Sequence, residues 1–298
     1  MFRVTHHGLV LLACLVGACG GSGSGGSTPA PEPGPQPSAF ANPQRVTILG
    51  YTDHAMEPSI SRDGQYLFFN NSNDPSVNTN LHWAERIDDL TFQYRGEIAG
   101  VNTTLLEGVA SMDRNNVFYF VSTRSYNQTA STLYRGVFAN GAITGIELVP
   151  GVSTATPGIV NFDAEVSPDG NTLYFVESQF GPNGPLTADI LIAERTGVGF
   201  TRLSNGATIM QQINTGALEY APAISGSGLE IFFTRLEGNT AAIYTATRTI
   251  PSAPFGTPQK LEVITGFVEG PTLSPDEKSL YYHKNENGQF VLYRVTRP

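Results

Sequence analysis

Short apolar runs, rather than long amphipathic segments, dominate the chain from residue 43 to its end. The runs are rich in Phe, Tyr, Val and Ile, and Gly, Asn, Asp or Pro residues bound them. Aromatic and β-branched residues in short runs between turn-forming residues are typical of β-strands. No window keeps the period of about 3.6 residues that an amphipathic helix would give. The pattern therefore predicts an all-β domain.

One sequence of strand, turn and strand recurs five times, at intervals of about 50 residues. In its fullest form an inner strand ends at Ser167, the tripeptide Pro168-Asp169-Gly170 makes a tight turn, and an apolar strand at 173–175 returns. Proline presets φ, aspartate caps the turn through its side chain, and glycine accepts a positive φ. The serines that mark the five units are Ser61, Ser111, Ser167, Ser225 and Ser274.

Each unit continues with further strands. A third strand is predicted at 81–83, 133–134, 190–192, 243–244 and 292–293, and an Arg follows it in four units, at Arg86, Arg195, Arg248 and Arg297. A fourth, outer strand is predicted at 92–98, 143–149, 200–203 and 258–264. Units of four antiparallel strands that recur in this way are the blades of a β-propeller. We therefore predict a five-bladed β-propeller of four-stranded blades.

The fifth unit ends at Pro298, directly after its third strand, so it lacks an outer strand of its own. Residues 43–49 resemble 258–264, the predicted outer strand of the fourth unit. We expect the N-terminal segment to supply the missing strand, with 46–49 beside 291–295. Such a closure would leave no open sheet edge between the first and last blades.

The N-terminal residues have the composition of a secretory signal and a linker. Residues 1–18 contain Arg3, an apolar run at 9–16 and small residues before Cys19, and the run is too short to cross a membrane. Val16-Gly17-Ala18-Cys19 resembles the bacterial lipobox, which implies a diacylglycerol on Cys19. The Gly/Ser-rich and Pro-rich residues of 19–42 would form a tether before a propeller at 43–298. Gly20 after the cysteine implies the outer membrane, by resemblance to sorted lipoproteins.

The repeat itself resembles the WD-like propeller repeat of TolB-like proteins, over roughly residues 43 to 298. Residues 167–175 and 274–282 match it best, whereas 111–120 and 225–233 lack the proline and part of the Asp-Gly pair. The resemblance implies a fold and no reaction, because the repeated residues build a turn. TolB-like proteins carry a separate α/β domain before the propeller, where this chain has the tether, so their partners are not carried over.

The charge balance bears on partners. The chain has 17 Lys and Arg against 26 Asp and Glu, a net charge of -9, and its basic residues are scattered, which argues against nucleic acid. An acidic residue precedes or begins the inner strand of every unit. These residues, Glu57, Glu107, Asp163, Glu219 and Glu269, are predicted to ring the channel mouth as a binding site for a cation or a basic group. The alternative is that each of them caps a turn or pairs with a repeat Arg.

A second interpretation is catalytic. Five-bladed arabinanase- and fructosidase-like glycosidases place three carboxylates on inner strands, and residues 54–60 and 269–271 loosely resemble two of their segments. A carboxylate pair could protonate the leaving oxygen and activate water or attack carbon. The candidates are Glu57, Glu107 or Asp163, and Glu269, but Glu57 stands where Asp is expected and Glu269 falls in the fifth unit instead of the third.

The remaining candidates for chemistry are few. His54, His82 and His283 lack the spacing of a zinc site, and the polar run at 70–74 lacks that of a calcium loop. We expect no metal, no cofactor and, for Trp83, a packing role. The sequence favours a monomeric, non-enzymatic binding or scaffolding lipoprotein of the cell envelope, anchored to the membrane by its lipid, with an envelope protein or a glycan as partner. The alternative is a glycan-active hydrolase.

Overall fold

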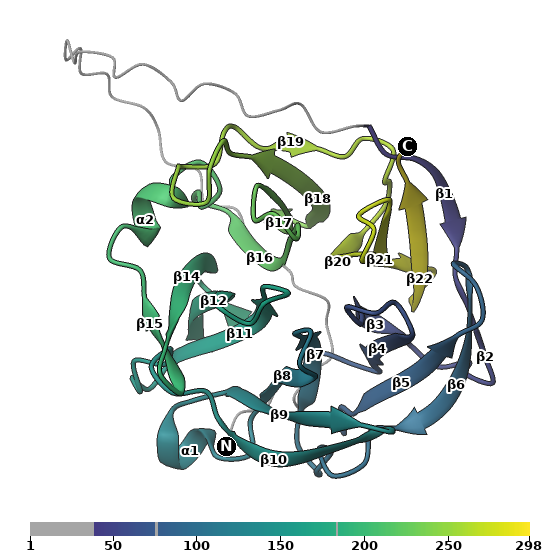
Figure 1. Cartoon of the computed structure of the whole chain (residues 1–298), viewed down its shortest axis with the longest axis horizontal. Helices are drawn as coiled ribbons and strands as arrows, with labels where there is room; N and C mark the ends of the chain where they lie inside the picture. Colours follow the sequence, from purple (N-terminus) through teal and green to yellow (C-terminus); the bar gives the residue numbers. More distant parts are fainter. Residues whose placement is uncertain (1–38, 75–76, 183) are drawn as a thin grey trace.

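Five small antiparallel sheets stand in a ring around a central axis in the computed structural model (Figure 1). The structure describes residues 39–74, 77–182 and 184–298. The predicted signal, the lipidation site at Cys19 and most of the predicted tether lie outside these residues. The prediction of an all-β, five-bladed propeller is confirmed. None of the helices in the described residues has the length and apolar character needed to span a membrane.

The first three blades are each built from strands that follow one another in the chain, from the axis outward. The first blade comprises β3 (Met56–Ile60), β4 (Tyr66–Asn70), β5 (Leu81–Arg86) and β6 (Thr91–Glu97). The second comprises β7 (Glu107–Met112), β8 (Val117–Ser122), β9 (Leu133–Ala139) and β10 (Ala142–Leu148). The third comprises β11 (Ile159–Val166), β12 (Thr172–Gly181), β14 (Asp189–Thr196) and β15 (Gly199–Arg202), with β13 (Gly184–Pro185) added to β12.

The last two blades follow the same order. The fourth comprises β16 (Leu218–Ile224), β17 (Glu230–Glu237), β18 (Thr240–Thr247) and β19 (Gln259–Lys260). The fifth comprises β20 (Val268–Leu273), β21 (Ser279–Glu286), β22 (Gln289–Thr296) and, from the N-terminal end, β1 (Ala41–Arg45). Two single-turn helices, α1 (Tyr126–Thr129) and α2 (Gly206–Ile209), lie in connections. The outer strand predicted at 258–264 is shorter than expected, because the chain turns where the Ile264 N–H bonds the Leu261 carbonyl at 3.0 Å.

The ring closes through the N-terminal segment, as predicted, but with a different register. It is β1 that pairs antiparallel with β22, through Gln44 opposite Arg294 and Arg45 opposite Tyr293 (Figure 1). The expected pairing of 46–49 is retained only at Val46, whose N–H bonds the Leu292 carbonyl at 2.9 Å. The next strand, β2 (Thr47–Leu49), leaves the fifth blade and runs parallel to β6 of the first blade. The N-terminal segment therefore joins both blades that meet at the closure.

The turn motif acts as the sequence predicts in four blades. In the third blade, for example, the Ser167 hydroxyl accepts the Thr172 N–H at 2.9 Å, and the Gly170 N–H bonds the Ser167 carbonyl at 2.8 Å. In the second blade the marker is Asp113, not Ser111: its carboxylate accepts the Val117 N–H at 2.9 Å. The predicted alignment of that unit was therefore wrong by two residues, because either oxygen-bearing side chain can cap the turn.

Every inner strand is interrupted by a β-bulge whose first residue has a positive φ. These five residues are equivalent positions of the blades, at Glu57 (48°), Val109 (53°), Asp163 (49°), Ala221 (49°) and Gly270 (64°). Four of them are not glycine, so the conformation costs free energy and must be imposed by the surrounding sheets. A bulge changes the direction of a side chain relative to the regular up-and-down alternation of a strand. The five bulge residues all line the pocket on the axis.

Aromatic side chains fill the spaces between blades. Phe68 of β4 meets Phe118 of β8 edge to face, with ring centroids 5.0 Å apart. Trp83 packs against Tyr66 and Phe138 at the same boundary, which confirms its predicted packing role. Contacts of this kind fix each blade against the next.

Candidate functional site

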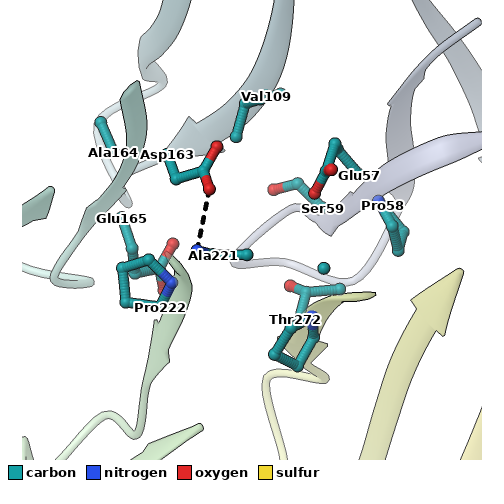
Figure 2. Close-up of a pocket in the computed structure, with 13 residues that line it drawn as sticks. Glu57, Pro58, Ser59, Val109, Asp163, Ala164, Glu165, Ala221, Pro222 and Thr272 are labelled. Carbon is teal, nitrogen blue, oxygen red and sulfur yellow. Dashed lines mark hydrogen bonds between the residues drawn. The ribbon is translucent and has the colours of Figure 1, made fainter. Parts of the chain in front are cut away.

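A pocket lies on the axis of the ring, where the five bulged strands come closest (Figure 2). It encloses about 330 Å³ of space, part of it continuous with solvent. Its 13 lining residues come from the inner strand of every blade. The lining residues are Glu57, Pro58, Ser59, Val109, Ala110, Asp163, Ala164, Glu165, Ala221, Pro222, Gly270, Pro271 and Thr272.

Glu57 lines this axial pocket from the first blade and is only 6% exposed. Its Oε1 accepts a hydrogen bond from the Asn73 amide at 2.8 Å, and its backbone N–H donates to His283 Nδ1 at 3.1 Å. Burial raises the pKa of the Glu57 carboxyl above its usual value, and the nearby Glu269 carboxylate raises it further, while His283 acts in the opposite direction. The carboxyl is therefore easier to protonate than an exposed glutamate.

Asp163 lines the pocket from the third blade and is 5% exposed. Its Oδ2 accepts the Ala221 N–H at 2.8 Å, drawn as a dashed line in Figure 2. Burial raises the pKa of Asp163 well above its usual value, and the Glu57 and Glu269 carboxylates raise it further. With both carboxyls shifted in this direction, the pocket retains a proton at pH values where exposed carboxyls have lost theirs.

Glu269 is held by side chains of two blades. Its Oε1 accepts the Tyr220 hydroxyl, and its Oε2 lies 3.1 Å from His283 Nε2. Because Nδ1 of His283 accepts the Glu57 N–H, the ring proton must sit on Nε2 and point at Glu269. Burial lowers the pKa of His283, but the Glu57 and Glu269 carboxylates outweigh it and raise the pKa. A second ring proton would break the bond from Glu57.

The five acidic residues predicted at the channel mouth do not form one ring. Glu57 and Asp163 occupy equivalent bulge positions and line the pocket, and Glu269 precedes the bulge residue of its blade. Glu107 and Glu219 lie two residues before theirs, fully buried and paired with arginines, at 3.4 Å from Arg124 and 2.7 Å from Arg235. These ion pairs with arginine are the alternative role that the sequence analysis left open. The sequence feature that distinguishes these two glutamates is a threonine four residues earlier in both units, whose hydroxyl donates to the carboxylate.

A largely buried ion pair connects the blades between the pocket and the turns. Arg62 reaches from the first blade to Glu165 of the third, with Nη2 and Oε1 2.9 Å apart, and Arg62 Nε bonds the Met112 carbonyl of the second at 3.0 Å. Glu165 lines the axial pocket, whereas Arg62 lines a second space of about 430 Å³ around the turns. The pair therefore lies between the two spaces. Sequence reasoning missed it, although Arg62 stands where the motif has proline.

The histidines and the polar run predicted to be structural have separate places. His82 Nδ1 bonds the Tyr94 hydroxyl at 2.9 Å, and His54 Nδ1 accepts the Phe290 N–H at 3.0 Å. Asn73, from the polar run, is the residue that contacts Glu57. Across residues 39–74, 77–182 and 184–298, no group of three or more His, Cys, Asp or Glu side chains is arranged to hold a metal ion.

The raised pKa of Asp163 has a consequence for stability. Above pH 4 or so an unfolded aspartate loses its proton, whereas the folded protein keeps it until the raised pKa is passed, so Asp163 destabilises the fold increasingly as pH rises. We expect Asp163→Asn to stabilise the protein by about 1–2 kcal/mol at pH 7, with the gain vanishing near pH 4. Urea unfolding at both pH values measures it.

The matched control is Asp169, which caps the turn of the same blade. Hydrogen bonds from Ser167 and Asn171 outweigh its partial burial and lower the pKa of Asp169. A lowered pKa gives stability that is present above the usual pKa and lost as pH falls. Asp169→Asn should therefore destabilise at pH 7 and have little effect near pH 3. An Asp163→Asn variant that is less stable than the parent at pH 7 would refute the assignment.

Comparison with known proteins gives matches in fold only. No protein-family profile and no curated protein matches the sequence. Among solved structures, BT0996 in an RGII complex has a TM-score of 0.59 at 11% identity, covering 88% of this chain and 92% of that one. A GH62 hydrolase in complex with xylotriose has a TM-score of 0.54 at 10% identity, covering 87% and 97%.

A TolB protein from Acinetobacter baumannii also matches, with a TM-score of 0.46 at 15% identity, covering 83% of this chain and 54% of that one. At these identities each likeness concerns the fold alone, and the chain is a propeller whose site has to be interpreted from its own residues.

Proposed function

We propose that the chain is a monomeric binding propeller of the bacterial cell envelope that receives a ligand in its axial pocket. The observation that carries the proposal is the state of Glu57 and Asp163. Both are buried, yet neither forms an ion pair with a Lys or Arg among the described residues, and Glu57 Oε2 and Asp163 Oδ1 accept no hydrogen bond there. Glu107, Glu165 and Glu219 each have an arginine instead.

Two buried carboxyls without an ion pair reduce the free energy of unfolding. Burying a carboxyl without full compensation costs free energy, and a hydrophobic pair of similar size would avoid it. Strongly shifted carboxyls in a concave site are a recognised mark of functional sites. Carboxyl oxygens that line the pocket and accept no hydrogen bond from the described residues favour a ligand that brings hydrogen-bond donors or positive charge, in an envelope protein or a glycan.

Glycan hydrolysis is the second candidate. It is favoured by the pairing of Glu57 with Asp163, two carboxyls of raised pKa in one pocket, and by a GH62 hydrolase among the structural neighbours. Two features weigh against it. The other carboxylates of that interpretation are engaged, Glu107 with Arg124 and Glu269 with Tyr220 and His283. None of the lining residues is aromatic, so the walls offer no platform for a sugar ring.

The envelope location follows from the N-terminal sequence. A lipid on Cys19 and a tether at 19–42 would hold the propeller at a membrane, in the outer membrane if Gly20 acts as a sorting residue. Membrane fractionation of cells that produce the Cys19→Ser variant tests the lipid anchor. A variant that stays with the membrane would count against it.

Thermal unfolding of the full-length protein in detergent tests the pocket. At pH 7, small amines or neutral sugars at millimolar concentration should raise the melting temperature by several degrees, since a ligand of the folded state stabilises it. Dicarboxylates should not, and Asp163→Asn should remove the shift. Equal shifts from dicarboxylates, or no shift from any class, would contradict the proposal. Hydrolysis of an aryl arabinoside to the phenol and arabinose, abolished by Glu269→Gln, would replace binding by catalysis as the function.

A further inference from the structure

We propose that the axial pocket takes a primary ammonium group on an unbranched alkyl chain, such as a lysine side chain or a linear diamine. The inference rests on the proposed binding function and names its ligand class. It depends on three features: the free carboxyl oxygens, the apolar part of the walls, and the small size of the space.

The Glu57 carboxyl can reach the pocket because the fifth blade has glycine at its bulge. A Cβ at Gly270 would lie 2.6 Å from Glu57 Oε2, closer than any real contact allows, and Gly270 has a φ of +64°. The glycine thus gives the Glu57 carboxyl its place at the pocket wall. Asp163 approaches the same pocket from the third blade (Figure 2). A small group with several N–H donors can bond both free oxygens, and an ammonium has three.

Part of the wall is apolar, beside the hydroxyls of Ser59 and Thr272. The residue after each bulge residue lines the pocket and is buried in every blade, and these five residues are Pro58, Ala110, Ala164, Pro222 and Pro271. Proline has no N–H, and none of the five has a polar side chain. Hydroxyls of a polyol that lie against these five residues would find no side-chain partner, which costs free energy. Methylene groups have no hydrogen bonds to lose there, and long amines bury their alkyl stems readily.

The size of the space and its charge balance limit the ligand. Arg62 neutralises Glu165, so the carboxyls of Glu57 and Asp163 supply the charge that remains near the ligand. The part of the pocket that a water-sized group can enter is only about 30 Å³, which is room for one small head group. It suits a single chain with a small head group better than a branched cation.

Binding should release protons. The ionisable groups around the two carboxyls are Glu269 and His283 of the fifth blade, Tyr220 of the fourth, and the Arg62–Glu165 pair. A cation stabilises the ionised forms of Glu57 and Asp163, whose raised pKa values favour protonation in the empty pocket. Affinity should therefore fall as pH decreases, and protonation of His283 would act in the same direction.

Isothermal titration of the full-length protein tests the ligand class. The probes are n-butylammonium, 1,4-diaminobutane and a lysine-containing tripeptide, against n-butanol, tetramethylammonium and xylotriose. We expect at least one primary amine to bind at least tenfold more tightly than n-butanol and tetramethylammonium, and more tightly at pH 8 than at pH 5. Binding of the tripeptide indicates a protein source of the amine, and binding of the diamine alone indicates a small molecule.

Variants distinguish binding in the pocket from non-specific binding of amines to the acidic surface. Asp163→Asn and Glu57→Gln should each weaken amine binding at least tenfold, whereas Glu194→Gln, at an exposed carboxylate, should not change it. Two substitutions keep the inference testable if one variant fails to fold, which thermal unfolding shows. Amine binding that survives both would overturn the inference. Xylotriose binding lost in Asp163→Asn, without amine binding, would overturn it and keep the binding function, whereas no binding by any probe would refute both.

Discussion

Replacing Arg235 by methionine is expected to destabilise the propeller by about 3–5 kcal/mol, because it leaves a buried carboxylate without its cation. Glu219 is completely buried, and its Oε1 lies 2.7 Å from Arg235 Nε. The guanidinium also bonds the Ile213 carbonyl at 2.9 Å and lies 4.8 Å from the centre of the Tyr244 ring. Methionine can keep part of the packing but supplies no charge or donor. Calorimetry should show a fall in melting temperature of roughly 10 °C.

The control is an exposed pair of the same chemistry. Arg95 and Glu85 are 2.6 Å apart, with side chains 47% and 40% exposed. Exposed pairs contribute less than about 1 kcal/mol, so Arg95→Met should change the melting temperature little. A double variant, Arg235→Met with Glu219→Gln, should recover part of the loss because it removes the stranded charge. Equal effects of Arg235→Met and Arg95→Met would show that burial of the pair contributes nothing.

Phe40→Ala is the second change with a large expected effect, about 3–5 kcal/mol. Phe40 precedes β1 and is 7% exposed. Its ring meets Phe232 edge to face at 5.7 Å, and the Arg297 guanidinium lies 4.8 Å from its centre. The side chains of β1 itself are exposed, so Phe40 supplies the apolar anchor for the strand that closes the ring. Urea unfolding measures the loss, and limited proteolysis should cut first near the N-terminal strand.

Leu49→Ala serves as the control for this change. Leu49 lies in β2, the other strand of the N-terminal segment, and is 41% exposed. Truncating it should cost less than about 1 kcal/mol and leave the proteolysis pattern unchanged. If Phe40→Ala cost no more than Leu49→Ala, main-chain pairing of β1 alone would account for the closure.

Much of the fold could be predicted from the sequence because each blade repeats a turn that only certain residues make. The second blade was misaligned because Ser111 and Asp113 are both able to cap a turn, and the apolar return strand tolerates either choice. The closing strand was predicted too far along the chain, because the apolar residues of 46–49 fit a strand pattern better than the residues of β1 do. The actual strand, β1, is exposed and depends on backbone hydrogen bonds, which hydrophobic patterning does not reveal.

The site could be predicted only in part. Glu57 and Asp163 were identified by their place before the repeat serine, which also fixes their position at the bulge. The sequence did not reveal that Glu107 and Glu219 lie two residues before the bulge of their strands, because the bulge residues there, Val109 and Ala221, are not glycine. The contacts of Asn73, Tyr220 and His283 join residues distant in sequence and depend on how neighbouring blades meet.

The Arg62–Glu165 pair lies between the axial pocket and the hollow around the turns. A molecule in the pocket would touch Glu165, and a molecule in the hollow, which Arg114 and Pro275 also border, would touch Arg62. An occupant of either space would therefore act on the same salt bridge, which gives one small propeller a direct physical connection between two of its surfaces.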